Sequence, residues 1–354
     1  MIQNLVMAKE TLDKRERIVR FIRANPDASS RNVFEALGGE LAYATVKRFL
    51  QNLLNENLLT TTGNGKATRY QVSPACELLL PVDLDEYFKS EIDDRVVRRS
   101  FNHSIFDLLA TINVFSAEEH TRLRSLQERY TEKTLALSKP EYEKELERLA
   151  IDLSWKSSQI EGNTYSLLET ERLFKDKHTA AGKTRDEATM LLNHKEALDF
   201  IIENPHHVNQ LSIARLEEIH SFLVKELNVE RNIRVRGVGI TGTNYRPLEN
   251  EFQIREALEA MCGLVNGLNN VFSKALLALV LISYIQPFTD GNKRTARIIS
   301  NAVLINANHC PVSFRTVDPI LYKKAMLLFY EQNNITAIKK IFIDQYDFAV
   351  NTYF

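Results

Sequence analysis

The stretch from Lys274 to Ile285 is apolar on almost every side, and this restricts the fold more than any other feature of the chain. A helix that is apolar all round has to be surrounded by protein, because a surface helix keeps a polar face. The apolar run is interrupted by Ser283 and is too short to cross a bilayer. We therefore predict a buried central helix in a mainly α protein, with no membrane partner.

Composition agrees with this expectation. Twelve glycines and nine prolines are few for 354 residues, which favours helices over tight turns. The three cysteines are far apart and lack metal-ligand spacing, so we expect neither a disulfide framework nor a metal cluster, and a reducing cytoplasm is the simplest compartment. The N-terminus has no apolar signal core. The length is sufficient for two domains.

The segment that follows the apolar helix carries the most chemical information. It reads Gln286-Pro287-Phe288-Thr289-Asp290-Gly291-Asn292-Lys293-Arg294-Thr295-Ala296-Arg297. A second helix is predicted over 295–306, so the segment is a loop that leads into a helix N-terminus, where free N–H groups and the helix dipole attract anions. Gly291 permits close approach of the backbone, and Asn292 adds an amide donor.

Charged side chains complete this segment. Arg294 and Arg297 supply two guanidinium groups suited to phosphate oxygens. Asp290 is a hard oxygen ligand that suits Mg²⁺ held between phosphates. Any one of these residues alone fits a capped helix with surface arginines, but the whole run predicts a nucleotide-phosphate site without a Walker loop.

The run resembles the signature of the Fic family, His-Pro-Phe-x-(Asp/Glu)-Gly-Asn-(Gly/Lys)-Arg-x-x-Arg, at every fixed position except the first, which is Gln286. The resemblance extends over about 155–337. Members of that family generally transfer AMP from ATP to a hydroxyl side chain of a target protein, with Mg²⁺. The resemblance assigns the metal to Asp290 and the phosphates to a set of neighbours: Gly291, Asn292, Arg294 and, for the terminal phosphate, Arg297.

A second segment resembles the inhibitory motif of the same family, (Ser/Thr)-x-x-x-Glu-(Gly/Asn), in Ser157 to Gly162. Gly162 fits the left-handed cap at the end of a helix over about 150–163. Glu161 then lies in the last turn, where the helix dipole disfavours a negative charge, so it needs a cation nearby. The resemblance supplies Arg297 as that cation and implies autoinhibition. An ordinary surface helix end is the alternative.

The third segment, Val235 to Pro247, alternates like a strand up to Ile240 and then becomes rich in turn residues. It resembles the family's β-hairpin flap, whose edge registers a target segment by strand addition. A plain structural hairpin is the alternative. The flap residues that we single out are Gly242, Thr243 and Tyr245. Of the eight histidines, His194 and His220 fall in predicted helices and are interpreted as structural.

Residues 1–75 have the pattern of a small winged helix-turn-helix domain. Helices are predicted over 12–24, 29–37 and 41–55, followed by strands at 58–62 and 68–72. This part contains eleven Lys and Arg against seven Asp and Glu, a net charge of +4, whereas the whole chain carries −1. In such a fold the third helix enters the major groove and the wing contacts phosphate. The candidate DNA-binding residues are Tyr43, Lys47 and Arg48 on the helix, with Lys66 and Arg69 on the wing.

A charge of +4 offers few phosphate contacts, so a protein-docking or dimerisation role for 1–75 remains the alternative, and a homodimer is compatible with the sequence. We interpret 76–115 as a linker or docking segment. Ser116 with two glutamates behind it begins a pair of scaffold helices that Pro140 separates. The predicted whole is a winged-helix domain, this linker, and a Fic-type helical bundle with a β-hairpin flap at 116–354.

The glutamine at position 286 determines whether general-base catalysis can be expected. In the family mechanism the histidine at this position takes a proton from the target hydroxyl, and a glutamine amide has no usable basicity. Three interpretations follow: a Fic protein with weakened chemistry, a pseudoenzyme that senses nucleotide and regulates through its N-terminal domain, or an inactivated variant of an ordinary AMP transferase. Phosphoryl transfer relies mainly on positioning and charge stabilisation, so slow turnover is compatible with the first.

Overall fold

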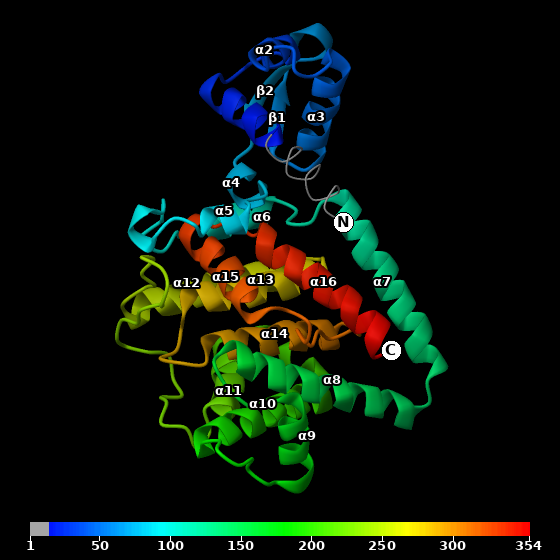
Figure 1. The fold of residues 1–354 in the computed structure, drawn as a ribbon, viewed down its shortest axis with the longest axis vertical. Helices are drawn as coiled ribbons and strands as arrows, with labels where there is room; N and C mark the ends of the chain where they lie inside the picture. The colour runs from blue at the N-terminus through cyan, green and yellow to red at the C-terminus, as the bar shows by residue number, and fades with distance from the viewer. Residues whose placement is uncertain (1–13) are drawn as a thin grey trace.

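The computed structural model describes residues 14–354. A small N-terminal domain lies on top of a larger helical body, and a short connection joins the two (Figure 1). Within the described chain the only sheet is the two-stranded one of the N-terminal domain, so the protein is mainly helical as predicted. None of the helices in residues 14–354 is both long and apolar enough to cross a membrane.

The N-terminal domain has the predicted winged-helix order. Residues 14–24 are helical, and the predicted start of this helix at Leu12 lies outside the described residues. The other elements follow in sequence: α2 (Ser30–Ala36), α3 (Tyr43–Asn55), β1 (Leu59–Thr62) and β2 (Arg69–Val72). The two strands pair antiparallel, and Ser29 caps α2 by accepting a hydrogen bond from the backbone of Asn32.

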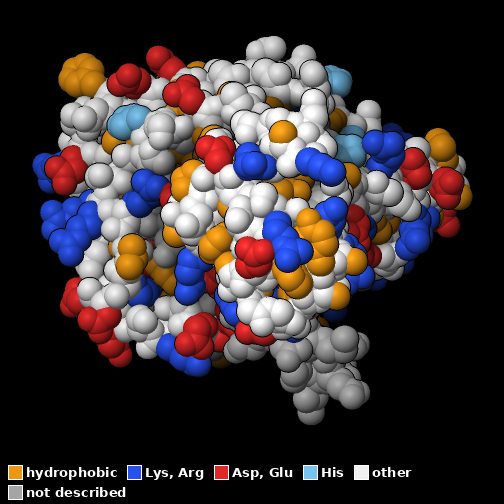
Figure 2. Space-filling model, turned by 90° about the horizontal axis from the view of Figure 1, so that it is seen from above, with side chains coloured by type: hydrophobic (Ala, Val, Ile, Leu, Met, Phe, Trp, Pro, Cys, Tyr) orange, Lys and Arg blue, Asp and Glu red, His pale blue; other side chains and the backbone are white. Residues whose placement is uncertain are grey.

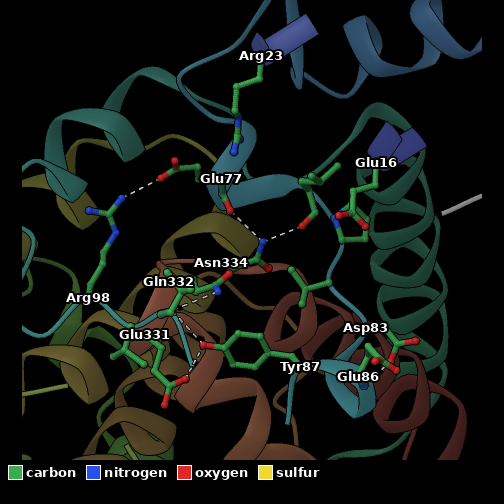
Figure 3. Close-up of a pocket in the computed structure, with 15 residues that line it drawn as sticks. Glu16, Arg23, Glu77, Asp83, Glu86, Tyr87, Arg98, Glu331, Gln332 and Asn334 are labelled. Atoms are coloured by element: carbon green, nitrogen blue, oxygen red, sulfur yellow. Dashed lines mark hydrogen bonds and ion pairs between the residues drawn. The ribbon is translucent and has the colours of Figure 1, made fainter. Parts of the chain in front are cut away.

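Short elements connect this domain to the body: α4 (Cys76–Leu79), α5 (Leu84–Tyr87) and α6 (Ile105–Thr111). A cavity of about 640 Å³ at the junction is lined by residues of α4 and α5 together with the first helix and residues 96–98 and 331–334 (Figure 3). Its polar groups largely satisfy one another. The Tyr87 hydroxyl donates to Glu331, and the Asn334 amide donates to the backbone of Glu77 and Leu80. The predicted linker therefore contains helices and is fastened to the body.

The body consists of helices, most of them joined by short loops. In chain order they are α7 (Ala117–Ala136), α8 (Lys139–Ile160), α9 (Leu167–Asp176), α10 (Arg185–Glu203), α11 (Ile213–Leu223), α12 (Glu251–Gly267), α13 (Val271–Ile285), α14 (Asn292–Asn306), α15 (Pro319–Gln332) and α16 (Thr336–Thr352). The longest connection, residues 224–250 between α11 and α12, contains the flap. The scaffold helices α7 and α8 begin at capping boxes, Ser116 with Glu119 and Ser138 with Glu141. Pro140 lies in the first turn of α8, where a missing N–H costs nothing.

The predicted central helix is confirmed. Twelve of the fifteen residues of α13 are buried, and the helix packs along α14 in the middle of the body (Figure 1). The second predicted helix begins earlier than expected, at Asn292, because the last residues of the motif already belong to its first turn. The motif is consequently held between the two most enclosed helices of the protein.

Candidate functional site

The loop between α13 and α14 starts at Gln286, which ends α13 in a left-handed conformation with φ of 52°. Both polar atoms of its side chain have partners. Nε2 donates to the Ser283 carbonyl at 2.6 Å, and Oε1 accepts from Asn292 Nδ2 at 3.0 Å. The amide therefore joins the end of α13 to the start of α14, a structural task that needs no basicity.

Asn292 closes the same loop. Its Oδ1 accepts from the Phe288 backbone at 2.8 Å, and its Nδ2 donates back to the Phe288 carbonyl at 2.8 Å. The side chain predicted to hold phosphate is thus engaged within the loop. The backbone is better placed for an anion, because Gly291 is the N-cap of α14 and no side chain caps this helix. The first N–H groups of a helix have no partner inside it, so they remain available.

His220 is a site residue whose position the sequence did not reveal. Its ring lies on Phe288, with centroids 3.6 Å apart and planes 2° from parallel. Nε2 lies 3.0 Å from the Asp290 carbonyl and Nδ1 lies 2.9 Å from the Arg231 carbonyl. Burial lowers the pKa of this imidazole. The ring therefore has the expected structural role, and it fixes the loop from the side of α11.

His220 also explains why position 291 is glycine. A Cβ at Gly291 would lie 3.3 Å from the His220 Nε2, and the φ of 78° disfavours L side chains. The close approach of ring and loop thus requires a residue without a side chain. Local sequence spacing gives no signal for this contact, because the two residues lie on different helices.

Asp290 and Arg294 form an ion pair of 2.9 Å at the mouth of the site. The Asp290 side chain is 64% exposed, whereas Arg294 is almost completely buried and its Nε has no partner among the described residues. No group of three His, Cys, Asp or Glu suited to a metal is present in residues 14–354. One exposed carboxylate still fits Mg²⁺, which proteins commonly hold with one or two carboxylates and the phosphates of the substrate.

Arg297 is fully buried, so it is not a surface arginine. Its guanidinium donates to Ser157 Oγ at 2.8 Å, to the Ser157 carbonyl at 3.0 Å and to Glu161 Oε1 at 2.8 Å. Its ring neighbour is Tyr322, at 5.3 Å from the guanidinium carbon. The pairing of Glu161 with Arg297, inferred from the sequence, is present in the structure.

A second cation holds Glu161, because Lys293 Nζ lies 3.1 Å from Oε2. Burial alone would raise the pKa of the Glu161 carboxyl, but the charges of Arg297 and Lys293 outweigh it and hold this pKa at about 2. Gly162 follows with φ of 103°, which is the predicted left-handed helix end. Glu161 is therefore ionised throughout the physiological pH range and lies over the cationic end of the loop.

These residues line a cavity of about 400 Å³. Its charged lining residues include Glu161, Asp290, Lys293 and Arg294. One face of α15 lines it as well, with side chains at helical spacing: Lys323, Met326, Leu327 and Tyr330. Residues 238–241 of the flap complete the lining. Cationic and apolar side chains together, at this volume, suit a small ligand with an anionic part.

The flap differs from the prediction. Residues 235–240 form an irregular loop, so the predicted strand and hairpin are wrong. Buried Arg234 donates to the carbonyls of Gln286, Arg236 and Leu248, and its own N–H donates to Pro287. Through Arg234, these bonds hold both ends of the flap beside the loop. Glycines within the segment also disfavour a strand.

The predicted flap residues lie apart from the cavity, which residues 238–241 line instead. Tyr245 is buried and its hydroxyl donates to the Tyr284 carbonyl. The Gly242 carbonyl accepts from Arg95 at 2.7 Å, and Thr243 Oγ1 accepts from the Tyr245 backbone at 3.1 Å. Gly242 and Tyr245 therefore anchor the flap to its surroundings, whereas Thr243 makes a bond within the flap.

The ion pair of Glu161 predicts a defined pH dependence of stability. Because the folded pKa of about 2 lies below the ordinary 4.5, the carboxylate contributes stability above pH 4.5 that is lost as pH falls towards 2. We expect Glu161→Gln to lower the free energy of unfolding by about 1–3 kcal/mol at pH 7, with the difference constant from pH 8 to 5. Urea unfolding at a series of pH values measures this.

The matched control is Glu171→Gln, which removes an exposed carboxylate that pairs with Lys175 on α9. It is expected to change stability by less than about 1 kcal/mol. A difference between the native protein and Glu161→Gln that already shrinks between pH 7 and 6 would contradict the assigned environment of Glu161.

Comparison with known proteins agrees with this geometry. Residues 210–304 match the Fic/DOC family, and residues 13–129 match the penicillinase repressor family. The chain is 28% identical over 166 residues to "Protein adenylyltransferase Fic" of Nematostella vectensis, covering 46% of this chain and 39% of that protein. It is 26% identical over 164 residues to "Protein adenylyltransferase fic-1" of Caenorhabditis briggsae, covering 43% and 31%. The chain thus spans only about a third of these relatives.

Solved structures share the fold. A segment of Fic-1 from Caenorhabditis elegans superimposes with a TM-score of 0.59 at 20% identity, covering 67% of this chain and 72% of that one. A Fic domain containing signaling protein from Bacteroides thetaiotaomicron gives 0.55 at 19% identity, covering 65% and 94%. Residues 210–304 therefore form a Fic/DOC domain, and the loop from Gln286 to Arg297 lies within it.

Proposed function

We propose that this cavity binds ATP with Mg²⁺ and supports AMP transfer to a protein hydroxyl, that Glu161 inhibits it, and that Gln286 makes the transfer slow. The observation that carries the proposal is the ion pair between Glu161, which lines the cavity, and Arg297, which is fully buried behind it. A buried cation beside free helix N–H groups attracts an anion, and a side-chain carboxylate already occupies that place. A terminal phosphate would compete with Glu161 for Arg297.

Each group in the site has a task in this proposal. Asp290 would hold Mg²⁺, which supplies charge neutralisation between phosphates. The uncapped N-terminus of α14, together with Arg294, would stabilise the charge that develops on the transferred phosphoryl group. The apolar side chains of Met326 and Leu327 on α15 would receive the base. The attacking hydroxyl belongs to a target protein, or to this chain itself, and would approach from the side of the flap.

Gln286 limits the chemistry in this proposal. An amide cannot accept the proton of the attacking hydroxyl, and both polar atoms of Gln286 already have partners. Loss of a general base removes about 10²–10⁴ in rate, whereas positioning and charge stabilisation remain. The alternative is a protein that binds nucleotide but transfers no AMP, either a natural pseudoenzyme or an inactivated variant. The Gln286→His experiment below distinguishes it from a slow enzyme.

The inhibitory pair is tested by binding. Glu161→Ala frees Arg297, so we expect the dissociation constant of Mg·ATP to fall by about 10- to 100-fold, the equivalent of about 1.5–3 kcal/mol for a hydrogen-bonded charge pair. Isothermal titration calorimetry on the full chain measures it. Glu171→Ala is the matched control and leaves affinity unchanged. Equal affinity of Glu161→Ala and the native chain would exclude competition between Glu161 and phosphate.

Catalysis is tested by restoring the base. In the Glu161→Ala background, Gln286→His is expected to raise label transfer from α-labelled ATP to protein by about 10²–10⁴-fold, because an imidazole accepts a proton near neutral pH. Gln286→Asn, which keeps an amide, is the matched control and stays at the slow rate. If the histidine variant binds ATP but transfers no more label than the control, the domain is a nucleotide-binding pseudoenzyme.

A second function, duplex DNA binding by residues 1–75, is favoured by how charges are paired in the N-terminal domain. Four arginines pair with acids inside it: Arg15 with Glu56, Arg17 with Glu40, Arg20 with Glu16 and Arg31 with Glu35. Lys47 and Arg48 on α3 are exposed and form no ion pair within residues 14–354. At the wing, Lys66 is exposed, whereas Arg69 is half-buried and donates to the Thr68 carbonyl. Neither forms an ion pair within residues 14–354. Unpaired cations thus coincide with the expected DNA face, which supports this function.

The surface around them is mixed. Seen from above, towards the N-terminal domain, basic and acidic side chains are interspersed without one broad basic patch (Figure 2). The ammonium group of Lys47 lies over the ring of Tyr43. The Tyr43 hydroxyl is hydrogen-bonded to Ser30, so this side chain joins α3 to α2 and is less available to DNA than the two cations are. Weak binding through a few phosphates is what this arrangement favours.

Salt dependence tests this second function. We expect the full chain to bind mixed-sequence duplex DNA, and the double variant Lys47→Ala/Arg48→Ala to lower the slope of log K against log salt by about 1–2, because each lost phosphate contact removes about 0.9. Fluorescence anisotropy at several salt concentrations measures it. Arg20→Ala/Arg31→Ala removes two paired cations and is the control. Salt-independent or absent binding would leave protein docking as the role of this domain.

A further inference from the structure

The cavity contains a buried hydroxyl that none of the roles above uses. Tyr330 lies on α15, is 0% exposed and lines the cavity together with Gln286 and Asn292. Within residues 14–354 its hydroxyl makes no hydrogen bond of ordinary geometry. A buried hydroxyl without a partner costs about 1–3 kcal/mol, so such a group at the wall of a cavity indicates that a ligand atom completes it.

The ring of Tyr330 is held firmly. It stacks on Tyr284 of α13 with centroids 6.1 Å apart and lies at 5.8 Å from Tyr245 at the base of the flap. Tyr245 in turn stacks on Tyr284 at 4.9 Å. Three rings from three segments therefore fix one another, and the hydroxyl of Tyr330 occupies a defined position, as a group that orients a ligand has to.

The neighbours of this hydroxyl are already engaged. It lies beside the side chains of Ser283 and Gln286. Ser283 donates to the Leu279 carbonyl, and Gln286 donates to Ser283 and accepts from Asn292. Burial raises the pKa of Tyr330, so the phenol keeps its proton and acts as a donor. Tyr330 therefore presents an uncommitted donor beside Gln286.

We propose that the hydroxyl of Tyr330 donates a hydrogen bond to an oxygen of the nucleotide's phosphate chain beside Gln286. Tyr330 is thereby a positioning residue of the site. The inference rests on the proposed nucleotide site and adds to it a contact that the loop motif does not contain. Both polar atoms of the Gln286 side chain are already hydrogen-bonded within the protein. In this proposal Tyr330 on α15 makes the contact to the ligand there.

The test uses the full chain in the Glu161→Ala background, with Mg·ATP as the probe and calorimetry as the measurement. Tyr330→Phe keeps the ring and its stacking and removes only the hydroxyl. We expect the dissociation constant to rise by about 3- to 10-fold, the loss of one hydrogen bond. The melting temperature without ligand is expected to stay equal or to rise, because an unsatisfied polar group is removed.

Tyr346→Phe is the matched control, since it removes a buried tyrosine hydroxyl that bonds to Gln127, outside the residues lining the cavity. It is expected to lower the melting temperature and to leave the affinity for ATP unchanged. If Tyr330→Phe binds ATP as tightly as its background, Tyr330 does not contact the ligand, and this inference alone fails. If Glu161→Ala itself does not bind ATP, the proposed function fails as well.

Discussion

A guanidinium that is completely enclosed by protein needs an anion or several acceptors, because the charge has lost its water. Arg297 meets this condition with Ser157 and Glu161, and the rest of the site is arranged around it. α14 carries Arg297 on the face that packs into the body, while α8 ends at Glu161 opposite. The end of α8 and the second turn of α14, from distant parts of the chain, thus meet at one buried charge. In the proposed function, a phosphate takes the place of the carboxylate at this charge.

The second constraint is the junction between α13 and α14. Gln286 and Asn292 bond to each other, His220 stacks on Phe288, and Arg234 bonds to the Gln286 carbonyl. The loop is therefore held from both sides before any ligand binds, which is the property that electrostatic stabilisation of a phosphoryl group requires. A glutamine at position 286 fits this framework without strain beyond its left-handed backbone. Binding and basicity are thus separable in this protein.

The segment that connects the N-terminal domain to the body is bonded to the body at several points. The backbone of Ile335 donates to Leu78, and Arg95 reaches from the connecting segment both to Glu331 and to the flap at Gly242. Segment 76–115 is consequently part of the packed body, which the linker-like composition of these residues did not indicate. Contacts of this kind join residues more than a hundred positions apart, and no local pattern encodes them.

The sequence by itself determined the helical class, the central helix, the winged-helix order and the loop motif that leads into α14, because each depends on local periodicity, capping or spacing. It also indicated that Glu161 at a helix end needs a cation, and the family resemblance supplied Arg297 as that cation. Tertiary structure alone decided the rest. Whether residues 235–240 form a strand depended on Arg234 competing for their backbone, and the role of His220 depended on a ring 3.6 Å away. The free hydroxyl of Tyr330 follows from packing, which determines the partners that a buried polar group finds.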